Sequence, residues 1–359
     1  MRVVITGGAG FLGSHLCEAL LDRGDSVVCV DDLSTGQWSN IEPFLANPRF
    51  TFVAADVTEP LHLTGEVDAI AHLASAASPP DYHRMPLETL AAGSRGTENA
   101  LKVALEHGAR FVLASTSEIY GDPLVHPQRE DYFGNVNSIG PRSVYDEAKR
   151  FAEAISMAYA RTLGVDVGIV RIFNTFGPRM RPGDGRVVTS FIAQALNGQP
   201  LTIYGDGSQT RSFCYVDDLV RGIVAMIDSD ERGPINLGNP VEKRVDELAR
   251  LVLELTRSDS LIEFHPLPVD DPTRRKPDIT RAAERLGWQP QVETAEGIRR
   301  TLDWFLANRQ LVADAAELIA GAQFEGSPAP LRLSVAGRPT ATITDIDDVS
   351  EDFSEALSA

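Results

Sequence analysis

Residues 1–16 read MRVVITGGAGFLGSHL, in which four glycines, at positions 7, 8, 10 and 13, follow an apolar run and lead into a helical pattern. The run at residues 3–5 has the composition of a buried strand, and residues 12–21 carry apolar side chains at helical spacing. Glycines at positions 7, 10 and 13 allow a tight turn, a close approach of phosphate to the backbone, and close packing of helix on strand. The following helix N-terminus favours an anion. The sequence therefore predicts a phosphate-binding loop at its start.

The alternation of an apolar run with a helical pattern continues through the first half of the chain. Apolar runs of strand length recur at residues 3–5, 27–30, 51–55, 69–73, 111–114 and 165–170. Amphipathic helical patterns lie between several of these runs, at residues 12–21, 87–105 and 145–163. Near-continuous apolar strands that alternate with helices are typical of a parallel sheet covered on both faces. The predicted fold class is therefore α/β, with a doubly wound parallel sheet.

The second half predicts a smaller domain that is interleaved with the first. After Phe176 glycines and prolines become dense, which indicates loops, although a helical pattern at 217–227 and a short strand at 235–237 are expected to return to the sheet. Residues 1–174 plus about 212–238 form the expected nucleotide-binding domain. Residues about 175–211 plus 239–310 form the expected smaller domain, with helices near 245–256 and 294–306. Residues 312–359 hold nine acidic residues against two arginines and predict an acidic, flexible tail.

Composition narrows the class of partner. The 359 residues are 43% hydrophobic and 23% charged, values of an ordinary globular protein. A net charge of −18 opposes phosphate backbones, so no nucleic-acid partner is expected. The sequence holds no apolar run long enough for a membrane span and no signal-peptide pattern at its start, so no membrane partner is expected. Three widely separated cysteines suggest neither disulfides nor a metal site, and they fit a reducing, cytoplasmic compartment.

Two acidic residues after the second apolar run indicate which nucleotide binds. Asp31 and Asp32 follow Gly13 by 18 and 19 residues, close to the roughly 20 at which an acid binds a ribose 2′-hydroxyl. A carboxylate there repels a 2′-phosphate. The pattern therefore predicts NAD as the cofactor in preference to NADP.

A tyrosine and a lysine form the centre of a candidate catalytic cluster. Tyr145 and Lys149 are four residues apart in a helical pattern, so they share one face. An ammonium beside a tyrosine stabilises the phenolate and lowers its pKa towards that of a usable base. Chance alone explains many such pairs. Here, however, hydroxyls and a carboxylate also end the strand at 111–114, in the run Ser115 to Gly121, where ligands bind in open α/β sheets.

With these motifs, the chain resembles the extended short-chain dehydrogenases that act on nucleotide sugars, and most closely the UDP-glucuronic acid decarboxylases, also called UDP-xylose synthases. The resemblance covers about residues 1–310. It rests on residues 7–16, HLA at 72–74, SP at 78–79, STSEIYGDP at 115–123, HPQ at 126–128, YDEAKR at 145–150, RIFNTFGPRM at 171–180, DGRVV at 184–188, YGDGSQTRSF at 204–213, NLGNP at 236–240 and DDPTRRKPDI at 270–279.

The resemblance implies a set of binding residues, a reaction and an assembly. The implied product is UDP-xylose, formed through a 4-keto sugar with enzyme-bound NAD recycled, and the implied assembly is a homodimer through a four-helix bundle. The cofactor-binding positions are Gly7, Gly10, Phe11, Leu12, Gly13, Asp31, Asp32, Ser34, Thr35, Gly36, Asp56, Val57, Leu73, Ser75, Tyr145, Lys149, Thr175 and Arg181. The substrate-binding positions are Ser78, Pro79, Tyr82, Asn174, Arg186, Val188, Tyr204, Gln209, Arg211 and Arg275. For Asp56 and Val57, a simple turn at the strand end is an equally good interpretation.

The same resemblance assigns catalytic roles. Tyr145 is the implied base, supported by Lys149, and Thr116 and Ser117 bond the C4 oxygen or the sugar. Glu118 and Arg275 are expected near C5 and its carboxylate, although a surface ion pair with Asp270 or Asp271 would equally explain Arg275. His72, in an apolar strand, is expected to be a hydrogen-bonded core residue, and His15 to pack beside the loop.

Two departures from the family pattern stand out, and two alternatives remain. Gly93 replaces the asparagine of the family, and Phe176 replaces a more usual tyrosine. The alternative activities are those of a nucleotide-sugar 4-epimerase or 4,6-dehydratase. Related dehydratases carry an Asp-Glu pair where this chain has Ser117 and Glu118, which argues against dehydration. A protein that only senses NAD is disfavoured by the presence of both Tyr145 and Lys149.

Overall fold

The computed structural model describes residues 1–267 and 274–310, and its centre is a seven-stranded parallel sheet. The strand order is β11-β6-β5-β4-β1-β2-β3, so the chain runs outward in both directions from β1 and β4. This arrangement confirms the doubly wound fold. The strands are β1 (Arg2–Thr6), β2 (Ser26–Asp31), β3 (Phe50–Ala54), β4 (Ala69–His72), β5 (Arg110–Thr116), β6 (Val167–Ile172) and β11 (Pro234–Leu237).

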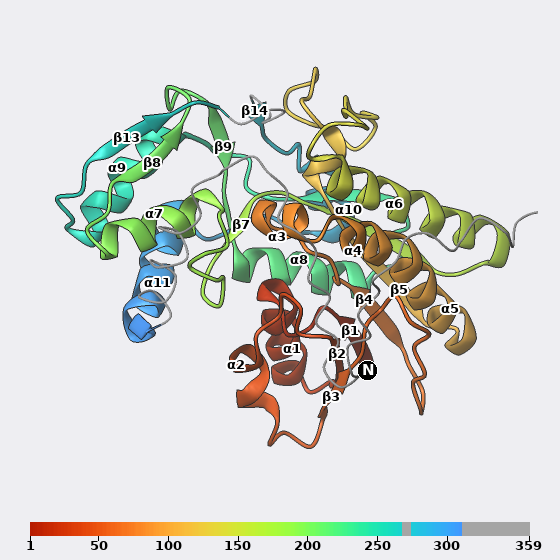
Figure 1. Cartoon of the computed structure of the whole chain (residues 1–359). Coiled ribbons are helices and arrows are strands. Elements are labelled where there is room, and N and C mark those ends of the chain that lie inside the picture. The colour runs from red at the N-terminus through yellow and green to blue at the C-terminus, as the bar shows by residue number, and fades with distance from the viewer. Residues whose placement is uncertain (268–273, 311–359) are drawn as a thin grey trace, which may run out of the picture. The chain divides into compact units, whose positions relative to one another are not determined.

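Both faces of the sheet are buried, as the apolar runs predict, except along the edge strand β3, where only Phe50 is buried. On β1, Val3 and Ile5 belong to one hydrophobic core and Val4 belongs to a second one. The first core is completed by α1 (Phe11–Arg23) and α8 (Val216–Asp228), which pack side by side. The second is completed by α5 (Thr97–His107) and α6 (Ser143–Leu163). Figure 1 shows α4 (Pro86–Ala91), α5 and α6 as neighbouring helices on one side of the sheet.

The expectation of loops after Phe176 is wrong for part of the second half. The helix α7 (Val187–Leu196) lies there, and it buries Val188, Phe191, Ile192 and Ala195 at helical spacing. It packs on α9 (Val245–Thr256) and on β8 (Leu201–Tyr204), which pairs with β13 (Ile262–His265). Because α7 is short and glycines lie close to both of its ends, the helical spacing of its apolar residues is difficult to recognise in the sequence.

The expected helix at 87–105 is also not continuous. It consists of α4, a π-helical segment η2 (Ala92–Gly96) and α5. A second small sheet brings residues far apart in the chain together, in the order β12 (Glu242–Arg244), β9 (Thr210–Ser212) and β14 (Arg274–Arg275). The remaining elements are α2 (Trp38–Ile41), η1 (Glu42–Phe44), α3 (Pro79–Arg84), η3 (Ser117–Tyr120), β7 (Thr175–Phe176), β10 (Cys214–Tyr215), α10 (Thr280–Leu286) and α11 (Thr294–Ala307).

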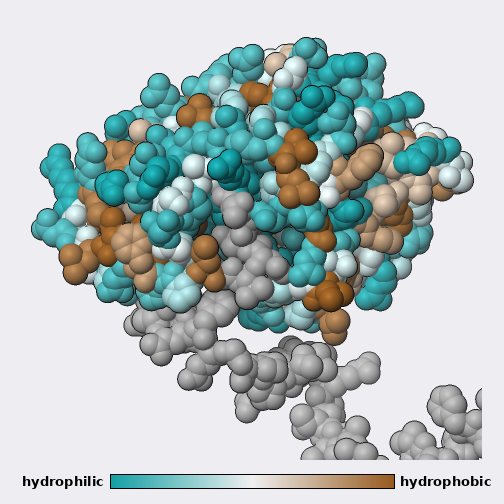
Figure 2. Space-filling model, turned by 90° about the horizontal axis from the view of Figure 1, so that it is seen from above, coloured by the Kyte–Doolittle hydropathy of each residue, from teal (hydrophilic) through white to brown (hydrophobic). Residues whose placement is uncertain are grey.

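The expected helix at 217–227 and strand at 235–237 are present as α8 and β11, and β11 pairs with β6 in the large sheet. None of the helices within residues 1–267 and 274–310 is long and apolar enough to cross a membrane. One face of the molecule is mostly hydrophilic, with apolar side chains in small separate groups (Figure 2). The predicted tail at 312–359 lies outside the described residues.

Candidate active site

The glycine loop joins β1 to α1 and is shaped by close backbone packing. Gly7 has a φ of +72°, which a residue with a side chain rarely adopts. A Cβ on Gly13 would lie 2.1 Å from the carbonyl oxygen of Gly7, so only glycine lets α1 start this close to the loop. Gly10 is the N-cap of α1, and no side chain bonds the first amides of the helix. These amides are therefore placed to bind an anionic diphosphate.

At the end of β2, Asp31 occupies the position expected for binding a ribose. The residue is 7% exposed, and its carboxylate accepts the backbone amides of Ala9 at 2.9 Å and Leu33 at 2.8 Å. Burial raises the pKa of Asp31 above its ordinary value, and the two amides oppose that shift. A Cβ on Gly36 would lie 2.7 Å from the Asp31 Oδ1, so glycine is needed there to make room for the carboxylate. Asp32 is exposed and accepts the amide of Ser34.

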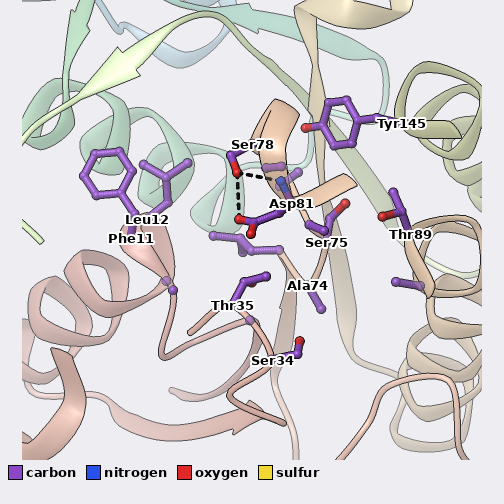
Figure 3. Close-up of a pocket in the computed structure, with 18 of the residues that line it drawn as sticks. Phe11, Leu12, Ser34, Thr35, Ala74, Ser75, Ser78, Asp81, Thr89 and Tyr145 are labelled. Atoms are coloured by element: carbon purple, nitrogen blue, oxygen red, sulfur yellow. Dashed lines mark hydrogen bonds between the residues drawn. The ribbon is translucent and has the colours of Figure 1, made fainter. Parts of the chain in front are cut away.

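A cavity of about 530 Å³ runs from the glycine loop to Tyr145. Figure 3 shows Phe11 and Leu12 on one side of it, Ser34 and Thr35 below, and Tyr145 and Thr89 opposite. Ser75 also lines it, and the Ser75 hydroxyl is buried without a hydrogen-bond partner among the described residues. The glycine loop, Asp31 and this hydroxyl thus fit a dinucleotide. The expected site residues that line the cavity are Gly7, Gly10, Phe11, Leu12, Gly13, Asp31, Asp32, Ser34, Thr35, Asp56, Val57, Leu73, Ser75, Ser78, Thr116, Ser117, Glu118, Tyr145, Lys149, Asn174, Thr175, Arg181 and Arg186.

Tyr145 and Lys149 lie on the first turns of α6 and face the end of β5. The Lys149 ammonium donates to the carbonyl of Ala114 at 2.8 Å and lies 5.9 Å from the centre of the Tyr145 ring. The ring of Tyr82, on α3, stacks on that of Tyr145 with centroids 5.4 Å apart. β5 ends in Thr116, whose hydroxyl accepts the amide of Glu118 and so starts the 3₁₀ turn η3. The strand end therefore brings the hydroxyls of Thr116 and Ser117 and the carboxylate of Glu118 into the cavity that Tyr145 lines.

The expected lowering of the tyrosine pKa by the lysine is not seen. Burial raises the pKa of Tyr145 to about 12, and the hydrogen bond with Thr116 offsets only part of that effect. Burial also lowers the pKa of Lys149 to about 8. The ammonium is bonded to a carbonyl and not to the phenol oxygen. In this state the side chains are thus in place, but the phenolate is not yet favoured.

Two arginines hold Glu118. The Arg142 guanidinium bonds Oε2 at 2.7 Å, and Arg275 from β14 bonds Oε1. Burial by itself would raise the pKa of Glu118, but the charges of Arg275 and Arg142 outweigh it and hold the pKa at about 2. Arg275 is 3% exposed, and its Nε atom has no hydrogen-bond partner among the described residues. The interpretation of Arg275 as a surface ion pair is therefore wrong, because the arginine is buried against Glu118.

Glu118 lines the large cavity and also a second one of about 300 Å³. The second cavity is formed by the turn after β5, the start of α6 and β14. Its lining residues are Glu118, Gly121, Asp122, Asn135, Val136, Asn137, Arg142, Asp146 and Arg275. Arg142 and Asp146 were not predicted from the sequence. Both lie within three residues of Tyr145, and that proximity to a candidate catalytic residue was the only available signal.

Other arginines of the site are paired with carboxylates that the sequence analysis also missed. Arg181 bonds Asp81, and Arg186 donates to Asp184 at 2.8 Å. Asp81 also accepts the Ser78 hydroxyl at 2.6 Å, and Ser78 caps α3. Ser78 followed by two prolines is a helix-start pattern that could have indicated this turn. An anionic ligand would have to replace these carboxylates at the arginines.

Some expected residues do not line the large cavity formed by residues 1–267 and 274–310. Gly36 packs against Asp31, and Tyr82 stands behind Tyr145. Val188 is buried in the hydrophobic core through α7. The other expected residues lie on α3, at the end of β8 and around β9 and β14; they are Pro79, Tyr204, Gln209, Arg211 and Arg275.

The replacement of asparagine by Gly93 has a packing reason. Gly93 lies in η2, and a Cβ there would be 2.6 Å from the Cβ of Ala148 and 2.9 Å from the Ala148 carbonyl oxygen. The π-helical segment therefore lies directly against α6, one residue before Lys149. In this chain the position has no room for an asparagine side chain unless the two helices separate.

Neither histidine takes a reactive position. His72 bonds the hydroxyls of Thr6 at 2.8 Å and Thr97 at 3.2 Å, and burial lowers its pKa to about 3. It is the hydrogen-bonded core residue that the sequence analysis expected. His15 bonds the carbonyl of Pro178 at 2.9 Å and packs edge-on against Phe11. It lies beside the loop, also as expected.

Comparison with known proteins places this geometry in a family. Residues 3–238 match the model of the NAD dependent epimerase/dehydratase family. UDP-glucuronic acid decarboxylase 1 of Arabidopsis thaliana is 52% identical over 314 residues, which are 88% of this chain and 72% of that protein. UDP-glucuronic acid decarboxylase 1 of Danio rerio is 52% identical over 304 residues, 85% of this chain and 72% of that protein.

Solved structures of other activities share the fold. A dTDP-glucose 4,6-dehydratase from Streptomyces venezuelae with NAD bound has a TM-score of 0.80 at 31% identity, over 86% of this chain and 98% of the other. A UDP-glucuronic acid 4-epimerase from Bacillus cereus, in complex with UDP-glucuronic acid and NAD, has a TM-score of 0.75 at 26% identity, over 86% and 100%. With its matched sequence and its glycine loop, the chain belongs to the NAD dependent epimerase/dehydratase family and groups there with the UDP-glucuronic acid decarboxylases.

Proposed function

We propose that this protein decarboxylates UDP-glucuronate to UDP-xylose through a 4-keto intermediate, with NAD bound and regenerated in each turnover. The observation that carries the proposal is the Arg275–Glu118 pair beside Tyr145. Epimerases and dehydratases share the fold, so the fold does not decide between activities. Glu118 lines the large cavity together with Tyr145, and a buried arginine paired with this glutamate suits a substrate with a carboxylate on C5.

The cofactor is held by the first half of the chain. The amides at the start of α1 bind the diphosphate, and Asp31 binds the adenosine ribose and disfavours a 2′-phosphate. Ser75 supplies its unpartnered hydroxyl, and Tyr145 and Lys149 lie at the far end of the cavity. The chemistry that NAD supplies when bound is acceptance of a hydride from C4 and its later return.

The residues around C4 manage its oxygen. Tyr145 takes the proton of the C4 hydroxyl, Lys149 supports the phenolate, and Thr116 and Ser117 bond the oxygen or the sugar. The ketone at C4 makes the C5 carboxylate part of a β-keto acid. Loss of carbon dioxide then leaves an enolate that is delocalised onto the C4 oxygen. Arg275 orients the carboxylate with its guanidinium, and Glu118 manages the proton at C5.

The nucleotide diphosphate of the substrate is bound by the smaller of two interleaved domains. We assign this role to Asn174, Arg186, Val188, Tyr204, Gln209 and Arg211. Arg186 exchanges its partner Asp184 for substrate phosphate, and Arg211 is the main phosphate clamp.

The protein assembles as a homodimer through the helices that carry Tyr145. Exposed apolar side chains on α4, α5 and α6 support this assembly, because Leu87 is 72% exposed, Phe151 48% and Leu105 42%. We place the protein in the reducing cytoplasm, since Cys17, Cys29 and Cys214 are buried and unpaired. Sedimentation of Phe151→Glu tests the interface, and a wild-type monomer would overturn it.

The deciding experiment incubates the purified protein with UDP-glucuronate and NAD and identifies the product by mass and proton spectrum. We expect carbon dioxide and UDP-xylose. Formation of UDP-galacturonate with no carbon dioxide would instead support the 4-epimerase. Turnover of a UDP- or dTDP-hexose with loss of water would support the 4,6-dehydratase.

A further inference from the structure

A proton must reach C5 after carbon dioxide has left, and the residues assigned so far do not supply it. This step rests on the proposed decarboxylation. The electron pair of the broken C5–C6 bond lies in the enolate, and a new C5–H bond consumes one proton. Tyr145 is engaged at the C4 oxygen. Glu118 is ionised in the free protein, because Arg275 and Arg142 hold its pKa at about 2. Neither side chain therefore begins the cycle with a proton to spare for C5.

A second carboxyl stands on the other side of Glu118. Asp146 follows Tyr145 on α6, is 5% exposed and lines the 300 Å³ cavity together with Glu118, Arg142 and Arg275. Its Oδ1 atom is buried without a hydrogen-bond partner among the described residues. A cavity of this size and polarity holds several water molecules. Asp122, Asn135 and Asn137 also line it and are exposed, so the cavity reaches the surface of the molecule.

The surroundings of Asp146 keep its proton near neutral pH. Burial raises the pKa of Asp146 to about 7, and the negative charge of Glu118 adds to that shift. Arg142 and Arg275 oppose it without cancelling it. The titratable and charged groups that face Asp146 are Glu118 on η3, Arg275 on β14, Tyr82 on α3, Arg142 before α6, and Tyr145 and Glu147 on α6 itself.

We propose that Asp146 stores the proton that protonates C5, and that Glu118 passes this proton from the second cavity to the substrate. When Arg275 turns to the substrate carboxylate, Glu118 loses its strongest counter-charge and can accept the proton of Asp146. Glu118 then donates it to C5 of the enolate, and the C4 ketone re-forms. Asp146, now ionised, regains a proton from water through the exposed side of the cavity. Asp146 acts through Glu118 and is a positioning residue in this scheme.

The test replaces the carboxyl by an amide of the same shape. In Asp146→Asn, we expect carbon dioxide release in a single turnover to run ahead of UDP-xylose formation, and kcat to fall about 100-fold. The decline of wild-type kcat as the pH rises through about 7, where Asp146 loses its proton, should disappear in this variant. Asp146→Glu restores a titratable group and should recover part of the rate. Glu284→Gln is the control, since Glu284 is an exposed carboxylate on α10 and lines neither cavity.

A titration checks the proposal independently of turnover. With carbon-13 in the aspartate carboxyls, wild-type protein should show one resonance titrating near pH 7 that is missing in Asp146→Asn. Absence of that resonance overturns the proposal, and so does an Asp146→Asn variant with unchanged pH profile and unchanged ratio of carbon dioxide to xylose. If the amide variant does not fold, the wild-type titration still decides. Failure of wild-type protein to release carbon dioxide would instead overturn the proposed function and leave the titration result standing.

Discussion

Arg275 reaches Glu118 across 157 residues of sequence, and this pair links β14 to the turn that follows β5. Arg275 also donates to the carbonyl of Gly121 at 3.2 Å, while Arg142 holds the other oxygen of Glu118. Because the Arg275 Nε atom has no partner among the described residues, the guanidinium still has a donor to offer a ligand. The small sheet thus places a buried cation at Glu118, which lines both cavities.

Breaking this pair should separate oxidation from decarboxylation. In Glu118→Gln and Arg275→Ala, we expect oxidation at C4 to continue in part and loss of carbon dioxide to slow about 100-fold or more, because the C5 carboxylate is no longer oriented and C5 lacks its proton donor. Rapid-quench analysis should find the 4-keto sugar accumulating. Wild-type rates of product formation in both variants would contradict the assigned roles.

The same pair predicts a dependence of stability on acid pH. The pKa of Glu118 is about 2 in the folded protein and ordinarily 4.5, so the unfolded chain binds more protons between these values. Stability should therefore be lost as the pH falls from about 4.5 towards 2. Urea unfolding across this pH range should show a smaller loss of unfolding free energy in Glu118→Gln than in the wild type. Parallel curves would count against the stabilisation of the Glu118 carboxylate by Arg275 and Arg142.

The sequence predicted the fold where local pattern and tertiary structure agree. Apolar runs of three to six residues are typical of buried strands when helices cover both faces, and β1, β2, β4, β5 and β6 follow that rule. The edge strand β3 is only partly buried. Helix α7 was not predicted, because it has only ten residues and glycines lie close to both of its ends. In the site, the glycine loop and Tyr145–Lys149 have local signatures. The contacts of Arg142 and Asp146 with the region around Glu118 have no local signature in the sequence, because they depend on how the turn after β5 folds over α6.

Asp31 should control both the affinity for NAD and the choice against NADP. Asp31→Ala removes a charged hydrogen-bond acceptor, worth about 1.5–3 kcal/mol, so we expect about 10- to 100-fold weaker NAD binding. Loss of the negative charge should at the same time reduce the difference in affinity between NAD and NADP. Calorimetric titration with both nucleotides measures this. Asp230→Ala, an exposed carboxylate after α8, is the control, and equal NAD affinity in Asp31→Ala and wild type would exclude the assignment.

Gly93 should resist replacement by the asparagine that the family resemblance led us to expect at this position. In Gly93→Asn the new Cβ meets Ala148 at 2.6 Å, so η2 and α6 must move apart. We expect a loss of about 1–3 kcal/mol in the free energy of unfolding, as in overpacked cores, and a displaced Lys149. Gly233→Ala is the control, because nothing lies within 4 Å of its Cβ and its φ is not positive. A variant as stable as wild type would show that the two helices separate at little cost.

Lys149 should cause a further loss of activity at alkaline pH, above the range in which Asp146 titrates. Its pKa falls from 10.5 to about 8 because burial penalises the ammonium, so the cation that supports the Tyr145 phenolate is lost above about pH 8. We expect kcat/KM for UDP-glucuronate to decline there. Between about 8 and 10.5 the unfolded chain binds more protons than the folded one, so this residue's contribution to stability rises with pH over that window. In Lys149→Met activity should fall at every pH, and this part of the pH dependence of unfolding should vanish. If Lys149→Met keeps the wild-type slope of unfolding free energy against pH between about 8 and 10.5, burial does not lower the pKa of Lys149 as inferred.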